Sequence, residues 1–270
     1  MTAAIQADAD ASAWRDCARY DRLAAFDRAT WAWECLRRAM GEDCQIFRTT
    51  RHRILRSDPP LCVLTGAAQQ PGGSETLPLA VFNDAGVFTG HVVWCADNHA
   101  PVLKAHARSL ADDCSTGFDL RALRHPAIVL RPRGKGEHVL IADGPRCIRI
   151  EVRKGTLLAG PVQLEFLVPG DNGMDGRILS LRRLAALHRL GRFPRTLFPP
   201  EQRARRWARA LQAWDGRKAG ASHRDIAGAL FGDKAVRRDW GGTSDYQRTQ
   251  VKRLLQTANM LIGGGWRKLL

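Results

Sequence analysis

The stretch DYQRTQVKRLLQTANMLIGGGWRKLL, residues 245–270, predicts one amphipathic helix that stops at the glycines 263–265. At 100° per residue its apolar side chains cluster on one side, which must pack inward. This inner group consists of Val251, Leu254, Leu255, Ala258, Leu261 and Ile262. The opposite side carries Asp245, Thr249, Lys252, Arg253 and Gln256, flanked by Tyr246 and Arg248. Ser244 precedes the helix and is a suitable cap.

The positive charge of the chain is confined to its C-terminal third. Residues 1–175 hold 21 Lys and Arg and 21 Asp and Glu, whereas residues 176–270 hold 21 Lys and Arg against six Asp and Glu. The net charge of +15 therefore lies wholly in the last 95 residues. Charge spread for solubility alone would not partition in this way, so the distribution favours a domain that faces a polyanion.

Length and composition bound the class of protein. The 270 residues, 44% of them apolar, suffice for one large domain or two to three small ones. No apolar run approaches the roughly 18 residues of a membrane helix, and the polar N-terminus excludes a standard signal peptide. Seven scattered cysteines without a CxxC pair fit reduced thiols. We expect a cytoplasmic, nucleoid-associated protein that needs no cofactor, metal or membrane.

The order of the patterns predicts an α+β fold in three consecutive regions. Residues 12–56 read as helical and SDPP at 57–60 breaks the chain, which gives an N-terminal helical domain over 12–60. Residues 61–175 read as a central antiparallel β-meander. Residues 176–270 form a basic helical domain. The clearest strands of the meander are 127–130, 138–142, 147–153 and 162–168, and 170–176 reads as an exposed loop.

Strand 147–153 shows a period of two. Ile148, Ile150 and Val152 alternate with the charged side chains of the same segment. Those charged residues are Arg149, Glu151 and Arg153. The pattern predicts one buried face and one face in water.

The basic region predicts a succession of helices. One spans 178–191 and ends at Gly191, and a second spans 199–216, from the prolines to Gly216. A third, 222–231, begins with Ser222 and Asp225 in the spacing of a capping box. A connection of about 12 residues, longer than the usual tight turn, leads to the last helix, 244–262. The last two helices form a helix-turn-helix-like arrangement, with the second helix suited to the major groove.

The outer face of the last helix carries the side-chain types that read base edges in DNA. Arginine bonds guanine bidentately, glutamine bonds adenine, and lysine meets guanine or phosphate. The candidates for base readout are Thr249, Lys252, Arg253 and Gln256. The candidates for backbone contacts are His223, Arg237, Arg238, Arg248, Arg203, Arg205, Arg206 and Arg209. The alternative is a solvated cationic surface helix.

Several motifs resemble those of a known family. ASHRDIAGALFG (221–232), DW (239–240), RTQVKRLLQTA (248–258) and GGGWRKLL (263–270) resemble the bacterial RovC-type DNA-binding domain family, and the similarity covers about 127–270. Trp14, Tyr20 and FDRATWAWECLRR (26–38) resemble the short transcriptional-regulator-like domain that often precedes it. The resemblance implies an activator of mobile-element transfer or secretion genes that acts as a homo-oligomer on promoter DNA. An antiactivator protein or RNA polymerase is a further candidate partner.

Other residue clusters are better explained by structural roles. The metal-ligand residue types His91, Cys95, Asp97, His99 and His106 follow no established metal spacing. The glycine-lysine segment 131–138 lacks the phosphate-loop pattern and reads as a hairpin tip.

Two alternative functions stay open. A DNA-processing enzyme component, such as a recombinase or nuclease accessory, needs an acidic metal cluster or a nucleophilic side chain among arginines. The nearby candidates are Asp239, Asp245 and Tyr246, which lack a convincing arrangement. An RNA-binding adaptor is the other alternative. Competition between duplex DNA and RNA distinguishes it from a regulator that binds duplex DNA.

Overall fold

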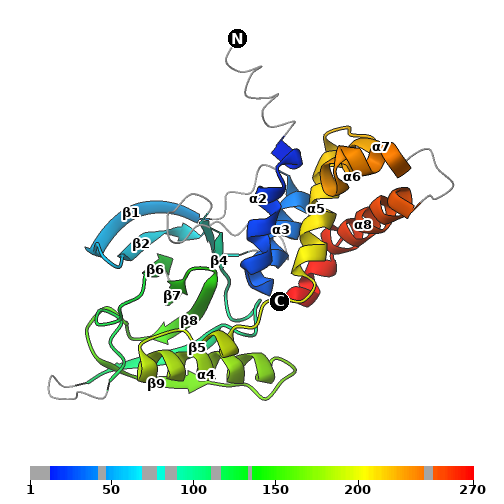
Figure 1. Ribbon diagram of the computed structural model, residues 1–270. Coiled ribbons are helices and arrows are strands. Elements are labelled where there is room, and N and C mark those ends of the chain that lie inside the picture. The colour runs from blue at the N-terminus through cyan, green and yellow to red at the C-terminus, as the bar shows by residue number, and fades with distance from the viewer. Residues whose placement is uncertain are drawn as a thin grey trace, which may run out of the picture. The chain divides into compact units, whose positions relative to one another are not determined.

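Two units built from interleaved parts of the chain make up the structure, a computed structural model (Figure 1). It describes residues 13–41, 47–68, 78–82, 90–110, 117–132, 136–239 and 246–270. Met1–Glu42 and Pro200–Leu269 form what we call the helical unit, and Asp43–Pro199 with Leu270 form the sheet unit. The mixed α+β class agrees with the prediction, but this partition differs from three consecutive regions.

The helical unit is held together by tryptophans. Trp14, Trp31, Trp207 and Trp266 are buried, and the rings of Trp31 and Trp207 meet edge to face at 5.5 Å between centroids. Large aromatic side chains supply much apolar burial in a small unit. Its α-helices are α2 (Cys17–Asp21), α3 (Arg28–Met40), α5 (Ala204–Lys218), α6 (His223–Phe231), α7 (Asp233–Asp239) and α8 (Tyr246–Ile262). Its 3₁₀ helices are Ala13–Arg15, Arg22–Ala25 and Gly265–Leu269.

The sheet unit contains a seven-stranded sheet in the order β1-β2-β6-β7-β8-β5-β9. These strands are β1 (Phe47–Arg56), β2 (Leu61–Ala68), β5 (Leu103–Ser109), β6 (Ala127–Pro132), β7 (Glu137–Asp143), β8 (Arg146–Lys154) and β9 (Val162–Leu167). Helix α4 (Met174–Leu190) packs Leu184 and Leu187 onto one face, followed by the 3₁₀ helix Arg195–Leu197. The two-stranded ribbon of β3 (Ala80–Phe82) and β4 (His91–Val93) contributes Ala80 and Val93 to the apolar cluster on the other face.

The predicted meander is not confirmed as such. Strands β6, β7 and β8 are antiparallel neighbours, but β5 stands between β8 and β9. Strand β5 runs parallel to β8, and β2 runs parallel to β6. Parallel neighbours require crossover connections, so local hairpin signals could not reveal this order.

The prediction of a wet face on β8 is wrong for Arg149 and Glu151, whereas Arg153 is exposed as predicted. Arg149 and Glu151 are only 6% and 4% exposed, because the β3–β4 ribbon and the loop after it cover that face. The Nε of Arg149 donates to the Val92 carbonyl at 2.7 Å, and the Ala96 amide donates to the Glu151 carboxylate at 2.7 Å. Buried charges are tolerated when they are hydrogen bonded in this way.

The N-terminal helical prediction holds only as far as Met40. Helix α3 ends at Gly41, whose φ of 78° is readily adopted by glycine. Residues 47–56, predicted as helical, form edge strand β1, which pairs with β2 from Phe47↔Ala68 onward. Thr49, Thr50 and Ile54 are β-branched residues that favour strands.

The predicted helix ends in the basic region are partly right. Helix α4 ends at Gly191 with φ 62°, as expected, but starts at Met174 inside the predicted loop. Helix α5 begins at Ala204 instead of the prolines and continues through Gly216. A Cβ on Gly216 would lie 2.8 Å from the Trp14 ring, so this glycine allows close packing instead of ending the helix.

No helix among the described residues is both long and apolar enough to cross a membrane.

Candidate nucleic-acid interface

Helix α8 lies with its inner face buried, as predicted. Val251, Leu254 and Ala258 are buried, as are Leu261 and Ile262 near its end. Because these positions fix the rotation of the helix, the opposite side faces outward. Lys252, Arg253 and Gln256 are exposed there, as is Arg248, and Thr249 is half-buried. The predicted cap Ser244 lies outside the described residues, as does Asp245.

Helix α5 adds a second set of cations beside α8. Its inner side buries Trp207 and Leu211, whereas the predicted backbone candidates on the helix and at its N-cap are all exposed. Those candidates are Arg203, Arg205, Arg206 and Arg209. The Nη2 of Arg206 donates to the Thr257 hydroxyl at 3.4 Å, and that hydroxyl donates to the Arg253 carbonyl at 2.9 Å. An α5 arginine therefore reaches α8 one turn beyond Arg253.

The start of α6 has the predicted capping box. The Ser222 hydroxyl accepts from the Asp225 amide at 3.2 Å, and the Asp225 carboxylate accepts from the Ser222 amide at 3.0 Å. The Ser222 hydroxyl also donates to this carboxylate and lowers the pKa of Asp225. The reciprocal bonds satisfy helix-end amides. The backbone candidate His223 opens the helix and is half-buried.

The helix-turn-helix detail is not confirmed, because α7 fills much of the connection between α6 and α8. Val236 is buried and anchors α7, as expected, and Arg237 is exposed. The side chain of Arg238 is outside the described part, as is Trp240.

A buried ionic network joins the N-terminal helices to α5. The Arg38 guanidinium donates to both carboxylate oxygens of Asp215, at 2.8 and 2.7 Å, and the Tyr20 hydroxyl donates to the same carboxylate at 2.7 Å. A third Arg38 nitrogen donates to the Glu34 carboxylate at 2.7 Å. The network anchors α5, the helix that carries the exposed arginines, to the N-terminal helices.

The network also perturbs its ionisable groups. Burial raises the pKa of Glu34, but Arg37 and Arg38 outweigh it and hold the pKa below its usual value. Burial and the Asp215 carboxylate raise the pKa of Tyr20. Sequence reasoning missed this network. The i,i+4 spacing of Glu34 and Arg38 was the available signal, whereas Asp215 lies 177 residues from Arg38.

The clusters weighed for metal or enzyme chemistry have other roles. In the sheet unit, His91 Nε2 bonds the Gly144 carbonyl at 2.8 Å, and Asp97 is paired with Lys104 and Arg153. Within the described ranges, no group of three or more His, Cys, Asp or Glu could hold a metal ion. Tyr246, a candidate of the enzyme alternative, is 67% exposed on α8.

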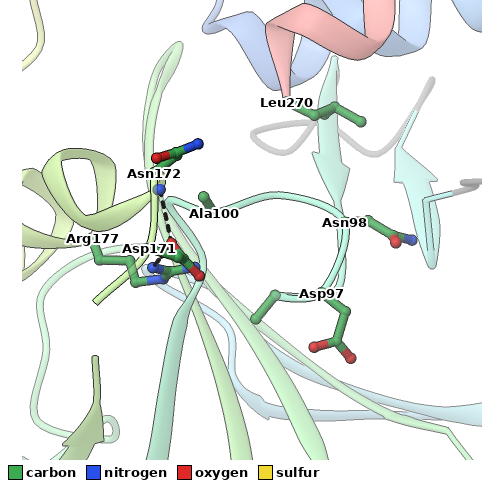
Figure 2. Close-up of a pocket in the computed structure, with 9 residues that line it drawn as sticks. Asp97, Asn98, Ala100, Asp171, Asn172, Arg177 and Leu270 are labelled. Carbon is green, nitrogen blue, oxygen red and sulfur yellow. Dashed lines mark hydrogen bonds and ion pairs between the residues drawn. The ribbon is translucent and has the colours of Figure 1, made fainter. Parts of the chain in front are cut away.

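A pocket in the sheet unit holds a tight ion pair (Figure 2). The Arg177 guanidinium donates to the Asp171 carboxylate at 2.5 and 3.0 Å, which lowers the pKa of Asp171. Asp97 also lines this pocket and is neutralised by its own partners. These charges are paired within the pocket, whereas the DNA-contact candidates predicted from the sequence lie in the helical unit.

An exposed cationic helix on a tryptophan-packed helical unit is suited to a protein that binds a nucleic acid. Residues 167–270 match the family model described as T6SS, Transcription factor, DNA binding domain, of the RovC type. Residues 13–43 match the proteobacterial transcriptional regulator-like domain. The chain thus carries both predicted domains, and DNA is the partner that the C-terminal one indicates.

The matched regions refine the predicted resemblance. The C-terminal match begins at residue 167, so it excludes the strands from 127 that the sequence similarity had included. Both domains belong to transcription regulators, which points to a regulator and not an enzyme. No curated protein matches the chain.

Proposed function

We propose that the protein is a sequence-specific regulator that binds duplex DNA with the outward face of α8. The observation that carries the proposal is the exposure of Lys252, Arg253 and Gln256 on a helix whose inner face is locked by packing. These side chains match the donor and acceptor patterns of base edges in the major groove. Thr249 is the fourth proposed base contact, on the same helix.

The exposed arginines of α5 hold phosphates in this proposal, together with His223, Arg237, Arg238 and Arg248. Phosphate contacts fix the register of the protein and carry no sequence information. Arg206 connects the proposed phosphate contacts of α5 with the proposed base contacts of α8, because its guanidinium reaches Thr257 on α8.

The protein acts as an activator of mobile-element transfer or secretion genes, and it does so as a homo-oligomer. The first part follows from the family resemblance. The second follows from geometry, since one short helix reads few base pairs and symmetric copies multiply the specificity. Such an activator is controlled by an antiactivator protein or acts through a contact with RNA polymerase. Sedimentation of the protein with promoter DNA tests the oligomer, and a single copy per duplex contradicts it.

Arg253→Ala is the test of base reading. On the cognate site, found by mapping genome-wide occupancy, we expect a loss of about 1–3 kcal/mol in binding, and a smaller loss on scrambled DNA. Arg205→Ala is the control for a phosphate contact, and it should weaken binding to both DNAs alike. It should also lower the slope of log affinity against log salt by about 0.9. Equal losses for Arg253→Ala on the two DNAs would remove α8 from base readout.

A further inference from the structure

Residues 176–200 contain six arginines and no Asp or Glu. Two of the arginines serve the fold of the sheet unit. Arg177 is buried against Asp171, and Arg183 donates to the Leu197 carbonyl at 2.8 Å while its guanidinium lies 4.4 Å from the Phe198 ring centroid. The other four are exposed, namely Arg182, Arg189, Arg192 and Arg195.

Helix geometry places Arg182 and Arg189 on the outer side of α4, whereas Arg192 and Arg195 follow its end. Arg182 and Arg189 are seven residues apart, so they share one face and their Cα atoms are about 10.5 Å apart along the axis. Ala185 is exposed between them and is too short to screen them. The inner side of the helix is occupied by Leu184 and Leu187, which pack on the sheet.

These cations differ from others of the same unit. Arg108 is paired with Glu165, and Lys104 with Asp97. Among the residues that the structure describes, Arg182 and Arg189 have no acidic partner within an ion-pair distance. The helix dipole favours a cation at Arg189, in the last turn, but not at Arg182, two turns earlier.

We propose that the exposed arginines of α4, Arg182 and Arg189, together with Arg192 and Arg195 just after its end, form a second contact surface for the backbone of duplex DNA. The inference rests on the proposed function, because it takes DNA as the polyanion. It is supported by the family match described as a DNA-binding domain, which starts at residue 167 and so includes all of α4.

Guanidinium groups bind phosphate oxygens through charge-assisted, often bidentate hydrogen bonds. Phosphates of one strand advance by about 3.4 Å along the duplex axis, so Arg182 and Arg189 match phosphates about three nucleotides apart. The surface grips DNA without reading its sequence. The N-terminal half of α4 exposes the apolar Met174 and Ile178 and the carboxylate of Asp175, so the surface begins at Arg182.

The test is the salt dependence of the full-length chain on a fluorescein-labelled duplex of scrambled sequence. The double variant Arg182→Ala/Arg189→Ala should lower the slope of log affinity against log salt by about 1.8, or 0.9 for each lost contact. The control is Lys104→Ala/Arg108→Ala, which removes the same charge from acid-paired positions and should leave the slope near that of the wild type. The variant Arg182→Gln/Arg189→Gln repeats the test and keeps more of the side-chain length than the alanine variant does.

A wild-type slope in both α4 variants, with unchanged far-UV circular dichroism, overturns the inference. That result is also the one expected if an acidic protein occupies the face. If Arg253→Ala still weakens cognate binding in that case, only the α4 surface is lost and the proposed function stands. If the wild-type chain binds no duplex at any salt concentration, the proposed function fails, and the α4 inference fails with it.

Discussion

Asp215 is the residue at which two distant parts of the sequence meet. Its carboxylate accepts hydrogen bonds from Tyr20 and Arg38, which come from the N-terminal segment, although Asp215 itself belongs to α5. Arg38 has a side chain only 6% exposed. A buried guanidinium must keep its acceptors, because an unpaired buried charge is far more costly than a broken surface pair.

Asp215→Ala is therefore expected to destabilise the protein by about 3 kcal/mol, at the lower end of the range for broken buried pairs because Asp215 is partly exposed. Chemical denaturation of the full chain measures this change. Glu165→Ala is the control, since its ion pair with Arg108 is exposed on both sides. It should cost about 0–1 kcal/mol. Equal costs for the two variants would contradict the importance of the network.

The Glu34 carboxylate links this network to pH. Its folded pKa lies below the ordinary value of 4.5, so the folded state binds fewer protons than the unfolded state in the interval between the two values. The stabilisation is complete above pH 4.5 and is lost as the pH falls through the lower folded pKa. Thermal unfolding between neutral pH and pH 3 should show a smaller acid-induced loss for Glu34→Gln than for the wild type. Parallel curves for the two proteins would contradict this linkage.

At the scale of the element, α5 shows why local signals mislead. A proline pair and a glycine predicted its ends, yet the helix starts at Ala204 and contains Gly216. Glycine inside a helix costs about 1 kcal/mol relative to alanine. Glycine nevertheless occupies position 216, because the Trp14 ring fills the space that a Cβ would take.

Gly216→Ala should therefore destabilise the wild type by about 1–2 kcal/mol, because overpacking exceeds the gain in helix propensity. The sign should reverse in a Trp14→Ala background, where the same change should stabilise by up to about 1 kcal/mol. Denaturant unfolding of the four proteins forms a double-mutant cycle. If Gly216→Ala has the same effect in both backgrounds, the ring contact does not explain the glycine.

How far the sequence predicted each element depended on whether its partners were local. Period and capping located α6, the phase of α8, and the strands β6 to β9, because these signals lie within a few residues. The parallel place of β5 and the burial of Glu151 depend on neighbours distant in sequence, and no local pattern encodes them. Strand β1 pairs with the adjacent β2, and its β-branched residues were a local signal that the helical prediction overlooked. The outward face of α8 was predictable, whereas the network of Arg38 and Asp215 that anchors the neighbouring helix α5 was not.

At the scale of the molecule, the N-terminal regulator-like segment and the C-terminal helices form one unit. Two family matches separated by more than 100 residues thus meet in a single core, where Trp31 packs on Trp207 and Arg38 binds Asp215. The sequence-based division makes residues 12–60 a domain of their own. The shared core instead makes residues 13–41 part of the scaffold that holds α5 and α8.

Deletion of residues 1–41 should consequently abolish duplex binding, although no residue of this segment is a proposed DNA contact. The deletion exposes Trp207 and leaves the Asp215 carboxylate without Arg38, so α5 and α8 lose the surface that orients them. Fluorescence anisotropy with duplex DNA measures binding, and circular dichroism with a hydrophobic dye measures the loss of packing. Deletion of residues 1–12 is the control, since it removes none of the contacts described above. Wild-type affinity in the longer deletion would show that α5 and α8 fold without the N-terminal segment, and the single-unit interpretation would then fail.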